Sequence, residues 1–222
     1  MKKITAIVLS LVLLFGAIKT VPLNVHAEEP EKLDAMRGID LDDIESGDGV
    51  EVEIYDSTQE YMTAIAQDKN INWTTKIKLI QEASTQSATQ YADWEYKYAT
   101  LKFTCKVSST YSCYPYFYVK FRYAKGADNP NRMESIKYFN IDRNYKGTSK
   151  QFAGTLYANL ETGKRLYWDL NGDFYENGTT TVTGGGSLGI GETAKANFSL
   201  SYSTQFFAYC HKSYLYEPAG LV

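Results

Sequence analysis

Apolar and polar residues alternate most regularly in two neighbouring stretches of the chain, residues 99–107 and 113–123. In each stretch every second residue is apolar, which is the period of a β-strand with one buried face. A short polar segment connects the two stretches, so the pattern predicts an antiparallel hairpin. Two registers keep the apolar faces opposed: one places Lys102 opposite Tyr118, and a slip by two residues places it opposite Tyr116.

The other face of this predicted hairpin is rich in tyrosine and positive charge in either register. Tyrosine combines a large apolar ring with a polar hydroxyl group, and exposed aromatic clusters mark binding surfaces. The alternative is that the lysine stems cover the rings, or that another element of the fold buries them. We therefore predict a binding surface for an extracellular glycan or protein at six residues: Tyr114, Tyr116, Tyr118, Lys102, Lys120 and Arg122.

One short helix is predicted near the start of the folded part of the chain. Residues 50–55 alternate as a strand, after which Asp56 or Ser57 can cap a helix that ends near Asp68. Residues 71–81 also alternate and contain several β-branched side chains, so we predict a strand there, with a helix as the alternative.

The apolar positions change parity near Tyr98, from even positions before it to odd positions after it. A β-bulge would explain the change. The other explanation is that the aromatic residues before Ala99 belong to the tyrosine-bearing face of the hairpin.

Short predicted strands separated by turn residues continue from residue 124 to the end of the chain. Residues 179–194 are rich in glycine and threonine and are predicted to form a flexible hairpin or loop. The strands are marked by residues 133–143, 152–160, 166–170 and 196–210. Together these elements predict an all-β fold, an antiparallel β-sandwich of roughly seven to nine strands with one short N-terminal helix.

The N-terminal 27 residues have the pattern of a secretory signal peptide, with two lysines, an apolar run and small residues that end at Ala27. Residues 28–49 are acidic and lack aromatic side chains, so we predict a disordered leader. Residues 50–222 then form a single β-sandwich domain. We expect a secreted, extracellular protein without a stable membrane anchor, because no second apolar span follows.

The charge balance argues against a nucleic-acid partner. The chain has 23 basic and 26 acidic residues, a formal net charge of −3. Removal of residues 1–27 takes away three lysines and no acidic residue, so the net charge becomes more negative. A negative chain with scattered lysines has no basic footprint for nucleic acid.

The three cysteines, Cys105, Cys113 and Cys210, all follow the predicted cleavage site. Export would make a disulfide possible, and we predict one that includes Cys105, the cysteine in the best-defined strand. Either of the other two is a possible partner, and the remaining cysteine would be a buried thiol.

Two sets of polar residues have the composition of a functional site. His211 follows Cys210 directly, but neighbouring residues of a strand point to opposite faces, which argues against a catalytic pair. Asp169, Asn171 and Asp173 have the spacing that begins a calcium loop, although the remainder of the EF-hand pattern is missing.

No catalytic motif and no cofactor motif occurs in the sequence, so we predict a protein that is not an enzyme and needs no cofactor. The predicted function is a non-catalytic extracellular binding module that uses the tyrosine-rich face. The alternative is a membrane-active secreted protein, in which residues 179–194 rearrange into a pore-forming hairpin.

Overall fold

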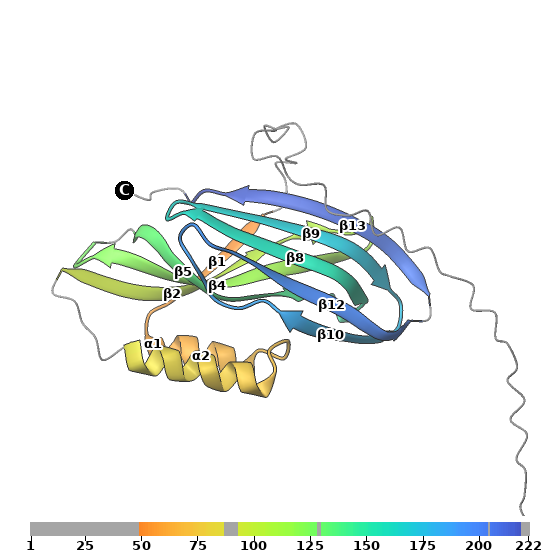
Figure 1. Cartoon of the computed structure of the whole chain (residues 1–222), viewed down its shortest axis with the longest axis horizontal. Helices are drawn as coiled ribbons and strands as arrows, with labels where there is room; N and C mark the ends of the chain where they lie inside the picture. Colours follow the sequence, from red (N-terminus) through yellow and green to blue (C-terminus); the bar gives the residue numbers. More distant parts are fainter. Residues whose placement is uncertain (1–48, 87–92, 128–129, 204, 219–222) are drawn as a thin grey trace, which may run out of the picture. The chain divides into compact units, whose positions relative to one another are not determined.

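The computed structural model describes residues 49–86, 93–127, 130–203 and 205–218. Within these residues the fold is all-β: two large antiparallel sheets enclose a common core, and two helices lie beside one of them (Figure 1). Nine of the described strands have six or more residues. The predicted all-β fold is confirmed. The predicted signal peptide and leader lie outside the described residues.

The first sheet has the strand order β1-β2-β4-β5-β11, and the two-residue strand β3 also pairs with β4. Its strands are β1 (Val50–Tyr55), β2 (Trp94–Phe103), β3 (Cys105–Lys106), β4 (Ser112–Ala124), β5 (Pro130–Asp142) and β11 (Leu188–Gly189).

The second sheet has the strand order β10-β12-β8-β9-β13. Its strands are β8 (Gln151–Thr162), β9 (Arg165–Tyr175), β10 (Gly178–Gly184), β12 (Thr193–Ser203) and β13 (Phe206–Tyr216). A separate two-stranded ribbon connects the sheets along the chain, formed by β6 (Asn144–Tyr145) and β7 (Thr148–Ser149).

The predicted hairpin is formed by β2 and β4 in the slipped register, with Lys102 opposite Tyr116. The pairing is continuous from Trp94 to Lys102, so the change of parity near Tyr98 is not a β-bulge. Tyr96 and Tyr98 instead belong to the tyrosine face. Bulges occur on the other side of β4, where its pairing with β5 shifts at three places; each extra residue locally increases the twist of the sheet.

The main core lies between the two sheets and is built from the inward-facing residues of both. The ring of Phe103 on the first sheet lies 5.3 Å from that of Trp168 on the second, and Phe117 lies 6.5 Å from the same ring. Aromatic contacts of this kind add to the stabilisation that comes from removing apolar area from water.

A pair of facing glycines allows an aromatic ring to lie close to the second sheet. Gly154 of β8 is paired with Gly172 of β9, and the ring of Phe152 lies against both. A Cβ atom on Gly154 would lie 2.2 Å from the carbonyl oxygen of Asn171 and 2.8 Å from the Phe152 ring. Only glycine fits at such a close approach of two backbones.

The first helix, α1 (Thr58–Gln67), confirms the helix predicted from the capping pattern. The Ser57 side chain accepts a hydrogen bond from the Glu60 N–H, and the Glu60 carboxylate accepts one from the Asp56 N–H. These contacts satisfy two backbone donors at the helix start.

The strand predicted for residues 71–81 is wrong, because most of that segment belongs to the helix α2 (Trp73–Gln86). The Asn72 side chain accepts a hydrogen bond from the Thr75 N–H at the start of this helix. Leu79 and Ala83 are one helical turn apart and are both buried, whereas Trp73 is 74% exposed. Burial therefore follows the helical period, which outweighs the β-propensity of the branched residues.

The two helices cover the outer face of the first sheet, on the side away from the main core (Figure 1). A second, separate core forms there, and its buried aromatic rings are all tyrosines. The ring of Tyr61 on α1 stacks on that of Tyr98 on β2, with a centroid distance of 4.0 Å. The buried residues of this tyrosine core are Tyr55, Tyr61, Ile65, Ile71, Leu79, Ala83, Tyr98, Tyr116, Tyr118 and Tyr138.

Residues 179–194 contribute strands to both sheets, with short connections at 185–187 and 190–192, rather than forming one flexible hairpin or loop as predicted. β10 pairs with β12, and β11 pairs with β5 of the first sheet. The hydroxyl of Thr180 accepts hydrogen bonds from Arg143 Nη1 at 2.6 Å and from the Phe152 N–H at 2.9 Å. These bonds hold β10 in place although it has few large side chains.

Candidate functional site

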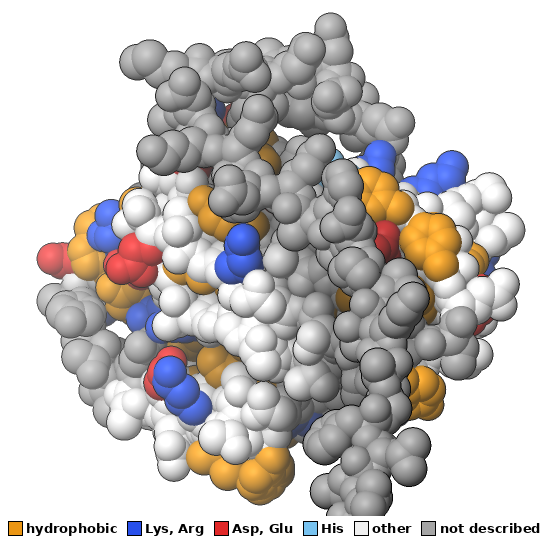
Figure 2. All heavy atoms as spheres, turned by 45° about the vertical axis from the view of Figure 1, so that its right-hand side comes forward, with side chains coloured by type: hydrophobic (Ala, Val, Ile, Leu, Met, Phe, Trp, Pro, Cys, Tyr) orange, Lys and Arg blue, Asp and Glu red, His pale blue; other side chains and the backbone are white. Residues whose placement is uncertain are grey.

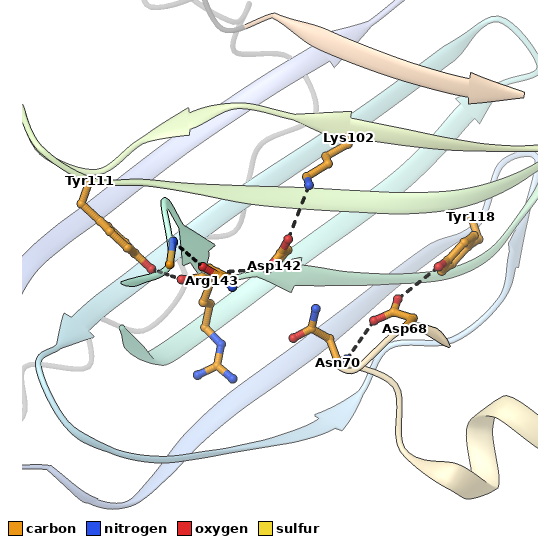
Figure 3. Close-up of polar contacts among 9 residues, drawn as sticks. Asp68, Asn70, Lys102, Tyr111, Tyr118, Asp142 and Arg143 are labelled. Carbon is orange, nitrogen blue, oxygen red and sulfur yellow. Dashed lines mark hydrogen bonds and ion pairs between the residues drawn. The ribbon is translucent and has the colours of Figure 1, made fainter. Parts of the chain in front are cut away.

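The centre of the predicted tyrosine surface is buried. Tyr116 and Tyr118 are each 5% exposed, because α1 and the turn that follows it pack over them. The Tyr118 hydroxyl donates to Asp68 Oδ2 at 3.1 Å (Figure 3). Asn140 Nδ2 donates to the carbonyl oxygen of Asn70 at 2.9 Å. The prediction of one continuous exposed stripe is therefore wrong, and the alternative in which another element covers the rings is the one observed.

Burial also raises the pKa of these tyrosines above its ordinary value. Desolvation raises the pKa of Tyr98 and of Tyr138 to about 12, and it raises the pKa of Tyr118 further. For Tyr118 the nearby carboxylate of Asp68 raises the pKa in addition. The central tyrosines thus contribute to packing and to the attachment of the helices.

At one end of the predicted surface, Lys102 forms an ion pair with Asp142. Lys102 Nζ lies 3.4 Å from Asp142 Oδ2 (Figure 3). It also lies 4.5 Å from the centre of the Tyr114 ring. All three side chains are partly exposed. The lysine has both a carboxylate and a ring as neighbours, an arrangement that stabilises the sheet locally.

The other end of the predicted surface carries a basic cluster, formed by Lys120, Arg122, Arg132 and Lys137. Lys120 Nζ lies 3.9 Å from the centre of the Tyr96 ring, and Arg122 Cζ lies 4.2 Å from that of Trp94. The pattern of the sequence predicted the first two cations on this surface but not the last two. They come from β5, whose register against β4 shifts at bulges that the alternation of apolar residues does not reveal.

A second candidate surface lies on the outer face of the second sheet, and the sequence pattern did not predict it as one site. The odd positions of β9 from Tyr167 to Asp173 lie on the side away from the main core, because Leu166, Trp168, Leu170 and Phe174 are buried in that core. On β13, Tyr209 and His211 share this side, because Cys210 between them is buried. Tyr157 of β8 also lies there, because it is paired with Asp169. We call this surface the polar face; its residues are Tyr157, Tyr167, Asp169, Asn171, Tyr209 and His211.

The side chains of the polar face hold one another in place across the strands. His211 Nε2 lies 2.9 Å from Asp169 Oδ2, and the Tyr209 hydroxyl donates to Asn171 Oδ1 at 3.0 Å. Burial raises the pKa of Asp169, and the neighbouring His211 opposes this effect. Tyr209 is 56% exposed, so its ring is accessible to a partner.

The residues proposed for calcium do not form a calcium loop. Asp169, Asn171 and Asp173 all lie within the extended strand β9. Alternate residues of a strand are about 6.6–6.8 Å apart along its axis. Asp169 and Asp173 are separated by twice this distance, so their carboxylates cannot bind one ion together. Among the described residues no group of three or more acidic, histidine or cysteine side chains is arranged to hold a metal ion.

The cysteines face the main core. Cys210 is buried while the neighbouring His211 is exposed, which confirms that the two point to opposite faces. All three cysteines are thiols in the described structure, so the predicted disulfide is not formed in it. Cys105 Sγ lies 3.7 Å from Cys210 Sγ, and the Cys105 backbone is paired with that of Cys113.

Side chains of both charges are interspersed with hydrophobic groups on the face of the molecule shown in Figure 2. No helix among the described residues is long and apolar enough to cross a bilayer.

The pore-forming alternative stays a prediction. A test of it must avoid Leu188, because that residue is buried in the main core.

Comparisons of the chain with protein-family models, with curated proteins and with solved structures found no match.

Proposed function

We propose that the protein is a secreted, non-catalytic binding module that holds a glycan on the polar face of the second sheet. The observation that carries the proposal is the exposed Tyr209, whose hydroxyl is fixed by Asn171, beside the His211–Asp169 pair. An aromatic ring offers an apolar surface to the flat side of a sugar, and amide, carboxylate and imidazole groups bond its hydroxyls.

The positions of these groups favour binding. Tyr157 and Tyr167 add two further rings beside the His211–Asp169 pair, with their centroids 6.1 Å apart. Side chains that are already held in place lose little conformational entropy when a ligand binds. More than half of the His211 side chain is exposed, so a ligand can reach it.

The test is a glycan array with the purified protein, followed by titration of any glycan that is retained. Tyr209→Ala and Asn171→Ala should each weaken binding by about tenfold or more, the loss expected for one anchor residue of an interface. Tyr202→Ala is the matched control. Tyr202 lies on β12 and is 61% exposed, but it does not belong to the polar face.

Equal losses in the Tyr202 and Tyr209 variants would contradict the proposal, since they would place the binding site elsewhere. Failure of the wild type to retain any glycan, or retention of a protein partner alone, would also contradict it.

Export would expose the thiols of the main core to oxidising conditions, and we predict that Cys105 and Cys210 then form a disulfide. Their sulfur atoms are in contact and need to approach from 3.7 Å to about 2.05 Å. The two thiols lose two protons and two electrons, which oxidised glutathione accepts by thiol–disulfide exchange. The bond would join the two sheets across a long loop and stabilise the fold by about 4 kcal/mol.

Peptide mapping by mass spectrometry after incubation with oxidised glutathione checks this prediction. Cys113→Ser should leave the bond intact, and Cys105→Ser should abolish it. A bond between Cys105 and Cys113, or three thiols after oxidation, would show that the prediction is wrong.

A further inference from the structure

The strand β1 forms an edge of the first sheet. Among the described residues it pairs only with β2, and its register is unbroken from Val50 opposite Phe103 to Tyr55 opposite Tyr98. The strand contains no glycine, proline or lysine and has no bulge. These are features that prevent an edge strand from pairing with another chain, so their absence leaves β1 able to accept a further strand.

The other edges of the two sheets differ from β1. The strand β11 has only two residues. The strand β10 begins and ends with glycine, and its register shifts after Gly178. The strand β13 carries Lys212, and its register shifts after Phe206. Shortness, glycine, lysine and bulges thus protect these three edges but not β1.

The register of β1 shows which of its backbone groups point to the open edge. The Gly49 carbonyl oxygen accepts a hydrogen bond from the Thr104 N–H of the neighbouring chain segment. Opposed residues of an antiparallel pair alternate between hydrogen-bonded and non-hydrogen-bonded positions, so every second residue from 51 onward bonds to β2. The N–H and C=O groups of Val50, Val52 and Ile54 are therefore directed to the open edge.

The side chains of β1 define what an added strand must carry. Val50 packs against the main core, but Val52 and Ile54 on the same face are 45% and 52% exposed, so the second sheet does not cover them. Glu51 and Glu53 are exposed on the other face. One face of this edge is therefore apolar, and the other is negatively charged.

The two glutamates form no ion pair with any described residue. Lys102 lies opposite Glu51, but its amine is 3.4 Å from Asp142 Oδ2 on β5 (Figure 3). Opposite charges on neighbouring strands stabilise their pairing, so a strand with basic side chains on this face complements β1.

Charge argues against two other occupants of the edge. A second copy of the chain, paired through β1 about a two-fold axis, would place glutamates opposite glutamates, which is destabilising. Residues 28–48 of the chain itself are rich in Asp and Glu and carry the same sign as the edge.

We propose that β1 binds an extended peptide in which lysine or arginine alternates with aliphatic residues, as an added strand of the first sheet. The aliphatic side chains of the peptide lie beside Val52 and Ile54, and its cations lie beside Glu51 and Glu53. The backbone groups at the open edge supply the hydrogen bonds of the new strand pair. The site belongs to the first sheet, so it does not depend on the proposed glycan binding at the polar face.

The experiment follows the fluorescence anisotropy of a labelled peptide of three Lys-Val repeats as the full protein is added. The wild type should bind this peptide about tenfold or more tightly than a peptide of three Glu-Val repeats, because several charge pairs change from attraction to repulsion.

Val52→Pro tests the backbone bonds. The substitution removes an N–H directed to the open edge and no bond to β2, so the fold should be kept, as circular dichroism can check. Binding of the Lys-Val peptide should be lost at concentrations that saturate the wild type. Val52→Thr is the matched control, because it keeps the N–H and the branched shape; it should still bind the peptide.

Glu53→Lys tests the charge of the edge. It should weaken binding of the Lys-Val peptide by about fivefold or more, because one attraction becomes a repulsion. Glu95→Lys makes the same change in net charge at an exposed position of β2 beyond the end of β1, and it should bind like the wild type.

Failure of the wild type to bind the Lys-Val peptide, equal affinity for both peptides, or undiminished binding by Val52→Pro would overturn the proposal. Sedimentation velocity tests the remaining occupant: a wild-type dimer that dissociates in Val52→Pro would show that a second copy occupies the edge, and would also overturn it. Tyr209→Ala should leave peptide binding unchanged, so the outcome at β1 is separate from that at the polar face.

Discussion

The buried tyrosine hydroxyls of the tyrosine core differ in whether they form a hydrogen bond. This difference predicts opposite effects of a Tyr→Phe substitution on stability. The Tyr55 hydroxyl lies 2.7 Å from Thr100 Oγ1. The Tyr61 hydroxyl is buried and makes no hydrogen bond to any described residue. Tyr61→Phe should therefore raise the free energy of unfolding by about 1 kcal/mol, whereas Tyr55→Phe should lower it by about 1 kcal/mol.

Urea denaturation followed by circular dichroism checks this pair of predictions. The two variants remove the same atom from the same core, so each is the control for the other. A loss of stability in Tyr61→Phe would show that the hydroxyl has a partner in solution and would contradict the prediction for this residue.

The same tyrosines show what the sequence can predict about a single residue. Alternation correctly predicted that Tyr116 and Tyr118 share a face with Lys120 and that Phe117 lies on the other. It did not predict what covers that face. The cover comes from a helix about 50 residues earlier in the chain, and a period of two contains no information on such a distant contact.

The stretch from Trp73 to Gln86 shows a limit of prediction at the scale of an element. Alternation and branched side chains favoured a strand, and the structure has a helix. The helix buries Leu79 and Ala83 but leaves Trp73 exposed, so its apolar residues do not all lie on the buried side. The apolar residues of this segment therefore fit neither the helical period nor the strand period completely, and their pattern does not distinguish a helix from a strand. The Asn72 cap was the available signal that was missed.

The pairing of β8 with β9 predicts a strong effect of one added methyl group. Gly154→Ala would place a Cβ atom 2.2 Å from a backbone oxygen and 2.6 Å from Gly172 Cα. Neither atom belongs to a flexible side chain, so the strands must separate, and we expect a loss of about 2 kcal/mol or more in unfolding free energy.

Gly189→Ala is the matched control for Gly154→Ala, because a Cβ there would meet only the end of the Glu192 side chain at 3.4 Å. Chemical denaturation of both variants checks the prediction. Equal stability of the two variants would show that the sheet relaxes without cost at the glycine pair.

At the scale of the whole molecule, the two-sheet fold was predictable from the sequence, but the order of its strands was not. Short strands with turn residues between them indicated the two-sheet fold. The order of the strands was not predictable, because β10 and β11 are only four residues apart in sequence yet belong to different sheets. The polar face was missed for a related reason: the neighbours β9 and β13 are distant in sequence, so the proximity of Asp169 and His211 is a consequence of topology.

The presence of two separate cores has a consequence for the opening equilibria of the native state. The helices contact the rest of the protein mainly through the small tyrosine core, whereas β8 and β9 are held by the larger core between the sheets. Segments with less buried apolar area open at a lower free energy than the global unfolding transition. Native-state hydrogen exchange should therefore show residues 58–86 exchanging as one unit before residues 152–175, and equal protection of both would contradict this order. Each such opening event uncovers Tyr116 and Tyr118, so the tyrosine face that is closed in the ground state becomes accessible in a minor, partly unfolded population.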